Sequence, residues 1–189
     1  MPEQMHPARR VLILLCLAAA PLRAQDVPAS DEPCLAAAQA DRPGRSQLVR
    51  CDRAIRQPDL PAPQRLAMLM NRGIALLRAG KLDKAESDFD LAIRSAPGLA
   101  EAWINKGVVL ARQPGREAEA VALISHGIEI GPKEPARAFF ARAQALEVAG
   151  RLKEAMDDYA AAARADPSWP APAEELKRFR VERRKVLRG

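Results

Sequence analysis

The chain has 189 residues, of which 48% are hydrophobic and 4% aromatic, and its formal net charge is +6 at pH 7. It contains two histidines and no threonine, no glycine-flanked serine, no glycine-rich phosphate loop and no spacing typical of metal ligands. Without the usual constellations for nucleophilic or metal-assisted chemistry, we predict no enzymatic activity, no cofactor and no metal.

Residues 1–24 have the pattern of a secretory signal peptide. Arg9 and Arg10 supply the positive start, a run of ten apolar residues follows, and Ala24 precedes a plausible cleavage point before Gln25. Ten apolar residues are about half of what a membrane-spanning helix needs. Together with the alanine- and arginine-rich usage of a bacterial protein, this predicts export to the periplasm with cleavage of the signal. The alternatives are an uncleaved segment that attaches the protein to the membrane, or a buried N-terminal helix.

Residues 25–64 are predicted to form a helical hairpin, a degenerate repeat or cap. Two short helices are expected on either side of the turn at 41–44, and Cys34 and Cys51 lie one in each. An even number of cysteines in an oxidising compartment predicts a disulfide between them. Closing this loop of about 17 residues is worth about 3 kcal/mol in the chain-entropy model. Two buried reduced thiols or a metal pair remain the alternatives, the second without a nearby histidine.

A pattern with a period of about 35 residues runs through the middle of the chain. Each unit begins with an apolar helix that carries a small residue in mid-course, where a larger side chain would hold two paired helices apart. After a glycine-containing break, a second helix carries a small and then a bulky residue four positions apart, and a proline ends it. In chain order these positions hold Gly73, Ala85, Phe89 and Pro97; then Gly107, Ala120, Ile124 and Pro132; then Ala143, Ala155, Tyr159 and Pro167.

On these residues the chain resembles the tetratricopeptide repeat family, whose unit is a helix–turn–helix of 34 residues. The motif from Trp103 to Gly107 stands where that family carries tryptophan followed by glycine. The middle unit departs from the family pattern by one extra residue in its turn and another near its end. The resemblance implies an all-α, right-handed superhelical solenoid of antiparallel helix pairs. Its three repeats would span residues 66–99, 100–135 and 136–169.

The last segment, residues 170–189, is predicted to be a basic helix that caps the final repeat. Residues 174–189 carry seven basic and three acidic side chains, so the positive charge of the exported protein is concentrated there. Leu176, Phe179 and Val186 lie roughly on one stripe, which would cover the open apolar face of the last repeat. The charged remainder is either a solvated outer face or an attractor for phosphate-rich surfaces.

The resemblance also places a binding groove, because the first helices of successive tetratricopeptide units line a concave surface. The first two units offer an apolar stripe there, and the third is polar and mixed in charge. Some family members clamp a chaperone's terminal carboxylate at positions that hold Met70 and Ile74 here, so we do not expect that function. The predicted groove residues are Met70, Ile74, Leu77, Ile104, Val108, Arg112, Arg137, Phe140 and Gln144.

The expected function is a non-catalytic interaction scaffold or adaptor in the periplasm, which holds a segment of a partner protein in the groove. The apolar stripe leaves two occupants open: a separate partner, or the protein itself through its N-terminal hairpin or a homodimer. The alternative function is a peripheral binder of anionic envelope surface, lipid or lipopolysaccharide, acting through residues 174–189. Nucleic acid is not expected, since that tail lacks the aromatic side chains that stack on bases, apart from Phe179.

Overall fold

The computed structural model of the protein describes residues 32–186, and within them the side chains of residues 33–179. The predicted signal peptide, with its cleavage point between Ala24 and Gln25, lies outside the described residues. The described part contains nine helices and no strand. The helices are α1 (Glu32–Gln39), α2 (Arg45–Ile55), α3 (Ala62–Arg78), α4 (Leu82–Ser95), α5 (Ala100–Leu110), α6 (Glu117–Ile130), α7 (Pro135–Val148), α8 (Leu152–Ala165) and α9 (Ala171–Val186).

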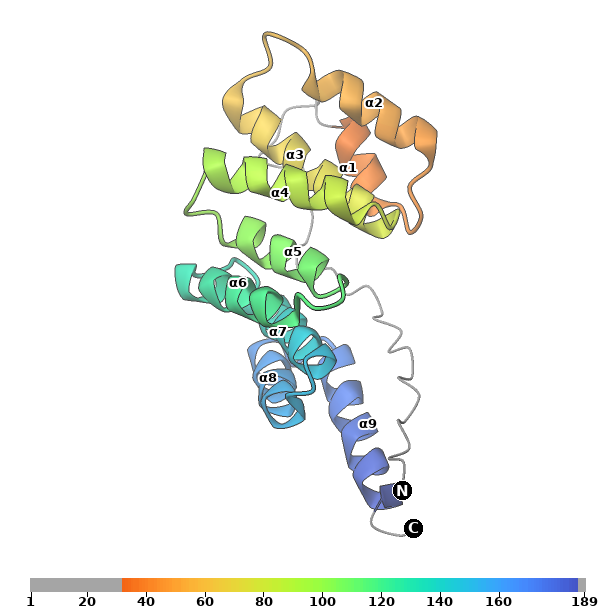
Figure 1. The fold of residues 1–189 in the computed structure, drawn as a ribbon, viewed down its shortest axis with the longest axis vertical. Helices are drawn as coiled ribbons and strands as arrows, with labels where there is room; N and C mark the ends of the chain where they lie inside the picture. Colours follow the sequence, from red (N-terminus) through yellow and green to blue (C-terminus); the bar gives the residue numbers. More distant parts are fainter. Residues whose placement is uncertain (1–31, 187–189) are drawn as a thin grey trace.

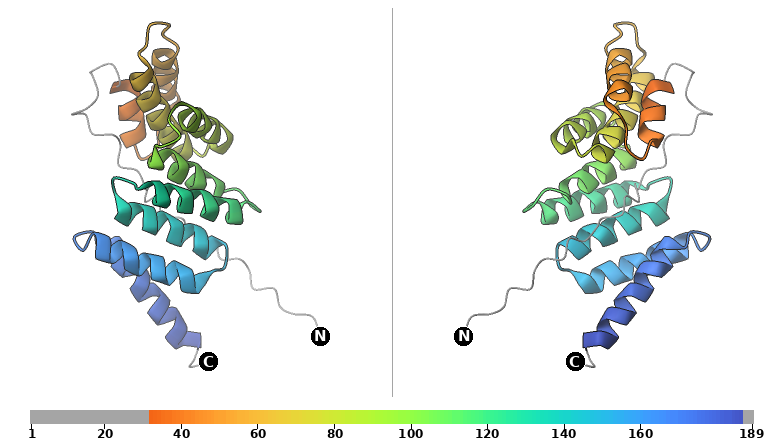
Figure 2. Two further views of the ribbon diagram at one scale, coloured as in Figure 1. Left: turned by 90° about the vertical axis from the view of Figure 1, so that its left-hand side faces the viewer. Right: turned by 90° about the vertical axis from the view of Figure 1, so that its right-hand side faces the viewer.

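The helices pair in chain order and the pairs stack in a single file (Figure 1). The partners within each repeat are α3 with α4, α5 with α6, and α7 with α8, and each second helix also packs on the first helix of the next pair. Figure 2 shows the same succession from the sides, from the N-terminal hairpin at one end to α9 at the other. The prediction of an all-α solenoid of antiparallel helix pairs is confirmed.

Glycine and proline bound these helices as the sequence pattern predicts. Gly80 and Gly150 adopt φ values of 70° and 75°, a left-handed conformation that only glycine takes without strain. The amide of Lys81 then donates a hydrogen bond to the carbonyl of Leu76 over 2.8 Å, which caps the end of α3. The helix α3 begins at Ala62, ahead of the predicted unit, because proline at its second position is compatible with a first helical turn.

The N-terminal hairpin consists of α1 and α2 joined by a disulfide between Cys34 and Cys51, as predicted. Both cysteines are fully buried, and α1 packs against α3 as well as against α2. Ala37 and Ala38 of α1 belong to the same apolar cluster as the side chains of α3. The small alanine side chains let the two helices lie close together, so the hairpin closes one end of the stack.

The opposite end of the stack is covered by α9. Phe179 is buried against the last repeat, with its ring centroid 6.0 Å from that of Tyr159. Leu176 is partly buried against the same apolar cluster. Arg178 donates to both carboxylate oxygens of Glu147 over 2.8 Å, which ties α9 to α7. The predicted capping role of this helix is therefore visible for its first half, while Val186 and the side chains beyond Phe179 lie outside the described ones.

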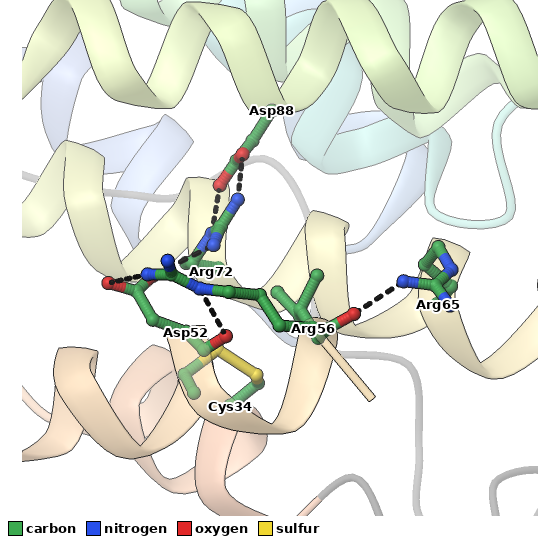
Figure 3. A network of polar contacts seen from close by, with 8 residues as sticks. Cys34, Asp52, Arg56, Arg65, Arg72 and Asp88 are labelled. Atoms are coloured by element: carbon green, nitrogen blue, oxygen red, sulfur yellow. Dashed lines mark hydrogen bonds and ion pairs between the residues drawn. A yellow bond between two sulfur atoms is a disulfide. The ribbon is translucent and has the colours of Figure 1, made fainter. Parts of the chain in front are cut away.

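Buried ion pairs recur at the same place in two repeats. Arg72 donates to both oxygens of Asp88 over 2.8 and 2.6 Å, and its third contact is Asp52 of α2 at 2.8 Å (Figure 3). In the third repeat Arg142 makes the same two-pronged contact with Asp158, over 2.7 and 2.9 Å. Each arginine thus joins the two helices of its own repeat, because a fork of donors matches a carboxylate.

Candidate functional site

The structure divides the predicted groove into a buried and an accessible part. Five of the nine predicted residues are at most 4% exposed, so in this conformation they pack inside the solenoid instead of facing a partner. The apolar stripe of the first two repeats is therefore buried by the chain itself, which is one of the two possibilities that the sequence left open. The buried residues are Met70, Ile74, Leu77, Ile104 and Phe140.

The reason for their burial differs from one repeat to the next. Met70 and Ile74 of α3 share an apolar cluster with α1, which packs on α3. Ile104 fills the space left by Gly127 of α6, where its Cγ1 is 2.6 Å from the place a Cβ would take. The ring of Phe140 meets that of Tyr159 edge-on within the last repeat, with the ring centroids 5.2 Å apart. The sequence left either a separate partner or the protein itself to cover the apolar stripe on α3. In the structure the N-terminal hairpin of the same chain covers it.

Four predicted groove residues remain half-exposed, and they lie on two adjacent first helices or just beyond them. Val108 is on α5 and Arg112 follows its end, whereas Arg137 and Gln144 are on α7. These helices contact each other in the stack. We call this set of four side chains the α5–α7 face. It is the part of the predicted groove that a partner can reach.

The charge on this face is concentrated in Arg112. Its Nη1 donates to the carbonyl of Leu77 over 3.3 Å, but its buried Nε has no hydrogen-bond partner. Burial lowers the pKa of Arg112, and no carboxylate within the described residues offsets that loss of hydration. Arg137, in contrast, is paired with Glu134 at 2.7 Å and lies over the ring of Trp169. Arg112 is therefore the guanidinium best placed to accept an anionic group from outside.

The sequence pattern identified Arg112 as a groove residue but not its lack of a carboxylate partner. Most other half-buried cations of the chain have one; Arg116, for example, binds Glu86 at 2.9 Å. This pairing depends on a carboxylate of the neighbouring repeat, which is 30 residues away in the sequence. Other pairs are local, such as Arg137 with Glu134 three residues earlier, and for those the sequence alone gives a signal.

The side chains that chemistry would need are engaged elsewhere. The ring of His126 stands edge-on to Trp103 with centroids 4.7 Å apart, and its Nδ1 is 3.8 Å from Glu129. Ser125 accepts a hydrogen bond from Arg142. Within the described residues no group of three or more histidine, cysteine or acidic side chains could hold a metal ion.

None of the helices in the described part of the chain is both long enough and apolar enough to cross a membrane.

Comparison with known proteins places this geometry in context. A sequence model described as tetratricopeptide repeat matches residues 50–100, 70–135 and 128–170. The fold is similar to the NMR structure of the first TPR domain of the human RPAP3 protein, with a TM-score of 0.57 and 20% identity over 61% of this chain and 90% of that one. It is also similar to a structure titled MamA RS-1 ArsTM double mutant, with a TM-score of 0.60 and 20% identity over 81% of this chain and 80% of that one. No curated protein sequence matches the chain. At this identity the two structures show a shared fold only.

Proposed function

Because the chain belongs to the tetratricopeptide repeat family, whose domains generally mediate protein–protein interaction, we propose that it is a scaffold that binds a partner protein through the α5–α7 face. The observation that carries the proposal is the state of Arg112. A half-buried guanidinium without a carboxylate loses hydration and recovers little, so an incoming anionic group gains more from it than from a fully solvated arginine.

The chemistry of the face defines the partner segment. Val108 offers an apolar contact four residues before Arg112, which is one helical turn. We propose a segment that presents one apolar side chain and one carboxylate, which is a change from a segment that would match the apolar stripe alone. The change follows from the burial of Met70 and Ile74 beneath α1.

We further propose that the protein works in the bacterial periplasm, with its signal cleaved. The disulfide between two fully buried cysteines supports this, since structural disulfides persist in oxidising compartments. The pattern of residues 1–24 supports it independently. N-terminal sequencing of the protein from a periplasmic extract is expected to begin at Gln25. Recovery of the intact chain from the membrane fraction instead would favour attachment through an uncleaved segment.

The proposed interface is tested by crosslinking in the native cell. A photo-crosslinking amino acid in place of Val108 is expected to capture a partner, and the same residue in place of Leu91 on α4, which is 38% exposed, is the matched control. Replacement of Arg112 by glutamine is then expected to weaken binding of the identified partner about tenfold or more. The corresponding change at Arg94, an exposed arginine of α4, leaves binding unchanged. Equal capture from both positions, or equal loss with both arginine variants, would overturn the proposal.

The alternative of an anionic-surface binder rests on residues 174–189, and most of their side chains lie outside the described ones. Of the basic residues that are described, Arg178 is bound to Glu147 and Glu175 and is therefore already neutralised by acids of this chain. The alternative stays a prediction. Removal of residues 180–189 distinguishes it, because a scaffold keeps its protein partner while a surface binder loses salt-sensitive binding to anionic vesicles.

A further inference from the structure

A pocket at the turn edge of the solenoid is lined by four cationic side chains. It has a volume of about 370 Å³ and lies between the turn that joins α1 to α2 and the turn that joins α3 to α4. The cations are Arg42, Arg45, Arg78 and Lys81. The remaining lining is apolar and includes Pro43 and Leu48, both buried. No acidic residue lines the pocket.

Like Arg112, these four cations lack a carboxylate partner, whereas many basic residues at the repeat interfaces have one. Among the side chains of residues 33–179 none of the four forms an ion pair. Lys106, for comparison, is 2.7 Å from Asp90 of the preceding repeat. The second described pocket also holds cations, but there Arg142 and Arg151 are bound to carboxylates of α8. Of these two pockets, only the one at the turn edge is therefore surrounded by cations without a carboxylate partner.

Arg78 is the member of the cluster that the fold holds in position. Its Nη1 donates to the carbonyls of Gln39 and Ala40 at the end of α1, over 3.3 and 3.1 Å. Its Nε is buried and has no hydrogen-bond partner. Burial lowers the pKa of Arg78, and the nearby charge of Asp41 opposes this only in part. The guanidinium is thus fixed by two neutral acceptors and lacks the anion that would balance its charge.

The surrounding backbone adds to the positive potential. Arg45 is the first residue of α2, and no acidic residue stands in the first turn of that helix to offset its N-terminal partial charge. The carbonyl groups at the C-terminal ends of α1 and α3 carry negative partial charge, but they already accept hydrogen bonds. That of Leu76 accepts from the amide of Lys81, and those at the end of α1 accept from Arg78. The field in the pocket is therefore set by the cations.

We propose that this pocket binds a phosphate monoester. A phosphate dianion neutralises more of the four charges than a carboxylate does, and its oxygens match the donor forks of arginine. The apolar lining at Pro43 and Leu48 would receive the ester carbon, and the volume is that of a small-ligand pocket. The phosphate belongs either to a soluble ester or to a lipid headgroup at the membrane surface.

The pocket shares no residue with the α5–α7 face. A failure of phosphate binding is therefore distinguishable from a failure of the proposed protein interface. A variant in which Arg42 and Arg45 are both replaced by glutamine leaves the core intact, because both side chains are exposed. The matched control replaces Arg53 of α2 and Arg94 of α4, which are exposed, do not line the pocket and change the net charge equally. Arg78 is left in place, since its contacts hold α1 to α3.

Binding is measured by calorimetry on the full chain at constant ionic strength. The probes are inorganic phosphate, glycerol 3-phosphate and, as a dianion without phosphorus, succinate. Sedimentation with phosphatidylcholine vesicles, with and without phosphatidic acid, tests the lipid source. We expect the phosphate probes to bind, the Arg42/Arg45 variant to bind about tenfold or more weakly, and the Arg53/Arg94 control to match the wild type.

The results distinguish a soluble phosphate ester from a lipid headgroup, and they also test whether the pocket binds phosphate at all. Binding of soluble esters supports a soluble ligand, and binding to phosphatidic acid vesicles alone supports a headgroup, provided that the Arg42/Arg45 variant loses it. Equal binding of succinate would overturn the assignment to phosphate. Absence of binding by every probe, or equal loss in the control variant, would overturn the site.

Discussion

The close packing of helices within a repeat can be tested at Gly107, in the middle of α5. A Cβ added to this residue would lie 2.5 Å from Cγ1 of Ile124 and 2.8 Å from the carbonyl oxygen of Ala120, both on α6. Contacts under 3 Å require something to move. The carbonyl belongs to helix backbone and cannot turn aside as a side chain can. Replacement of Gly107 by alanine therefore forces α5 and α6 apart.

Two opposing effects determine how much Gly107→Ala changes the free energy of unfolding. Alanine is favoured over glycine inside a helix by about 0.8–1.0 kcal/mol. Insertion of a methyl group into a filled core costs about 1–3 kcal/mol, and the backbone contact places this site in the upper half of that range. We expect Gly107→Ala to lower the free energy of unfolding by about 1–2 kcal/mol. For a domain of this size the melting temperature then falls by about 2–8 °C.

The assay is reversible unfolding in urea and heat, followed by circular dichroism at a helix wavelength. Gly98→Ala is the matched control, because nothing lies within 4 Å of the added Cβ and the residue does not have positive φ. That change is expected to leave stability unchanged or to raise it by about 0.4–1 kcal/mol through the unfolded state. A Gly107→Ala protein as stable as the wild type would show that α5 and α6 are not held at this distance.

Three further predictions concern the disulfide, a buried ion pair and a phenol. Replacement of both Cys34 and Cys51 by serine is expected to lower the free energy of unfolding by about 3 kcal/mol in denaturant titrations, and reductant would then have no additional effect on that variant. Asp158→Asn leaves Arg142 half-buried without its carboxylate, with an expected loss of about 2 kcal/mol in the same assay; no change would mean that the pair is only a surface contact. Tyr159 is the single tyrosine of the chain, and burial raises its pKa above the ordinary value of 10.0. The stability that the neutral, buried phenol provides is present below pH 10 and is lost as the pH rises through the folded-state pKa. Ultraviolet titration is therefore expected to show no phenolate at pH 10 in the native protein. In guanidinium, half of the phenol is expected to be ionised near that pH.

The sequence alone predicted the local architecture because that architecture depends on residues close to one another in the chain. A glycine before each second helix, a proline after it and small residues at the crossing points act within one repeat of 34 to 36 residues. The pairing of Cys34 with Cys51 is local in the same sense, since the hairpin between them is a short one. The length of α9 and the face it covers followed from an apolar stripe of a single helix.

The accessible part of the groove could not be predicted in this way, because it depends on what packs against each repeat. Ile74, Val108 and Gln144 hold equivalent positions in successive repeats, yet Ile74 is buried and the other two are half-exposed. The difference comes from α1, which covers α3 at the end of the stack, while α5 and α7 have no such cover among the described residues. Burial of a side chain is a property of its neighbours in space.

The sequence by itself determined the period, the helix pairs and the ends of the stack, because each is decided by backbone conformation and short-range packing. Only the tertiary structure decided whether a cation without an acidic neighbour nearby in the sequence finds a carboxylate. Arg72 reaches Asp88 and Asp52, whereas Arg112 and Arg78 reach only carbonyl oxygens. For these arginines charge balance depends on distances of a few ångströms between different helices, and sequence spacing does not record those distances.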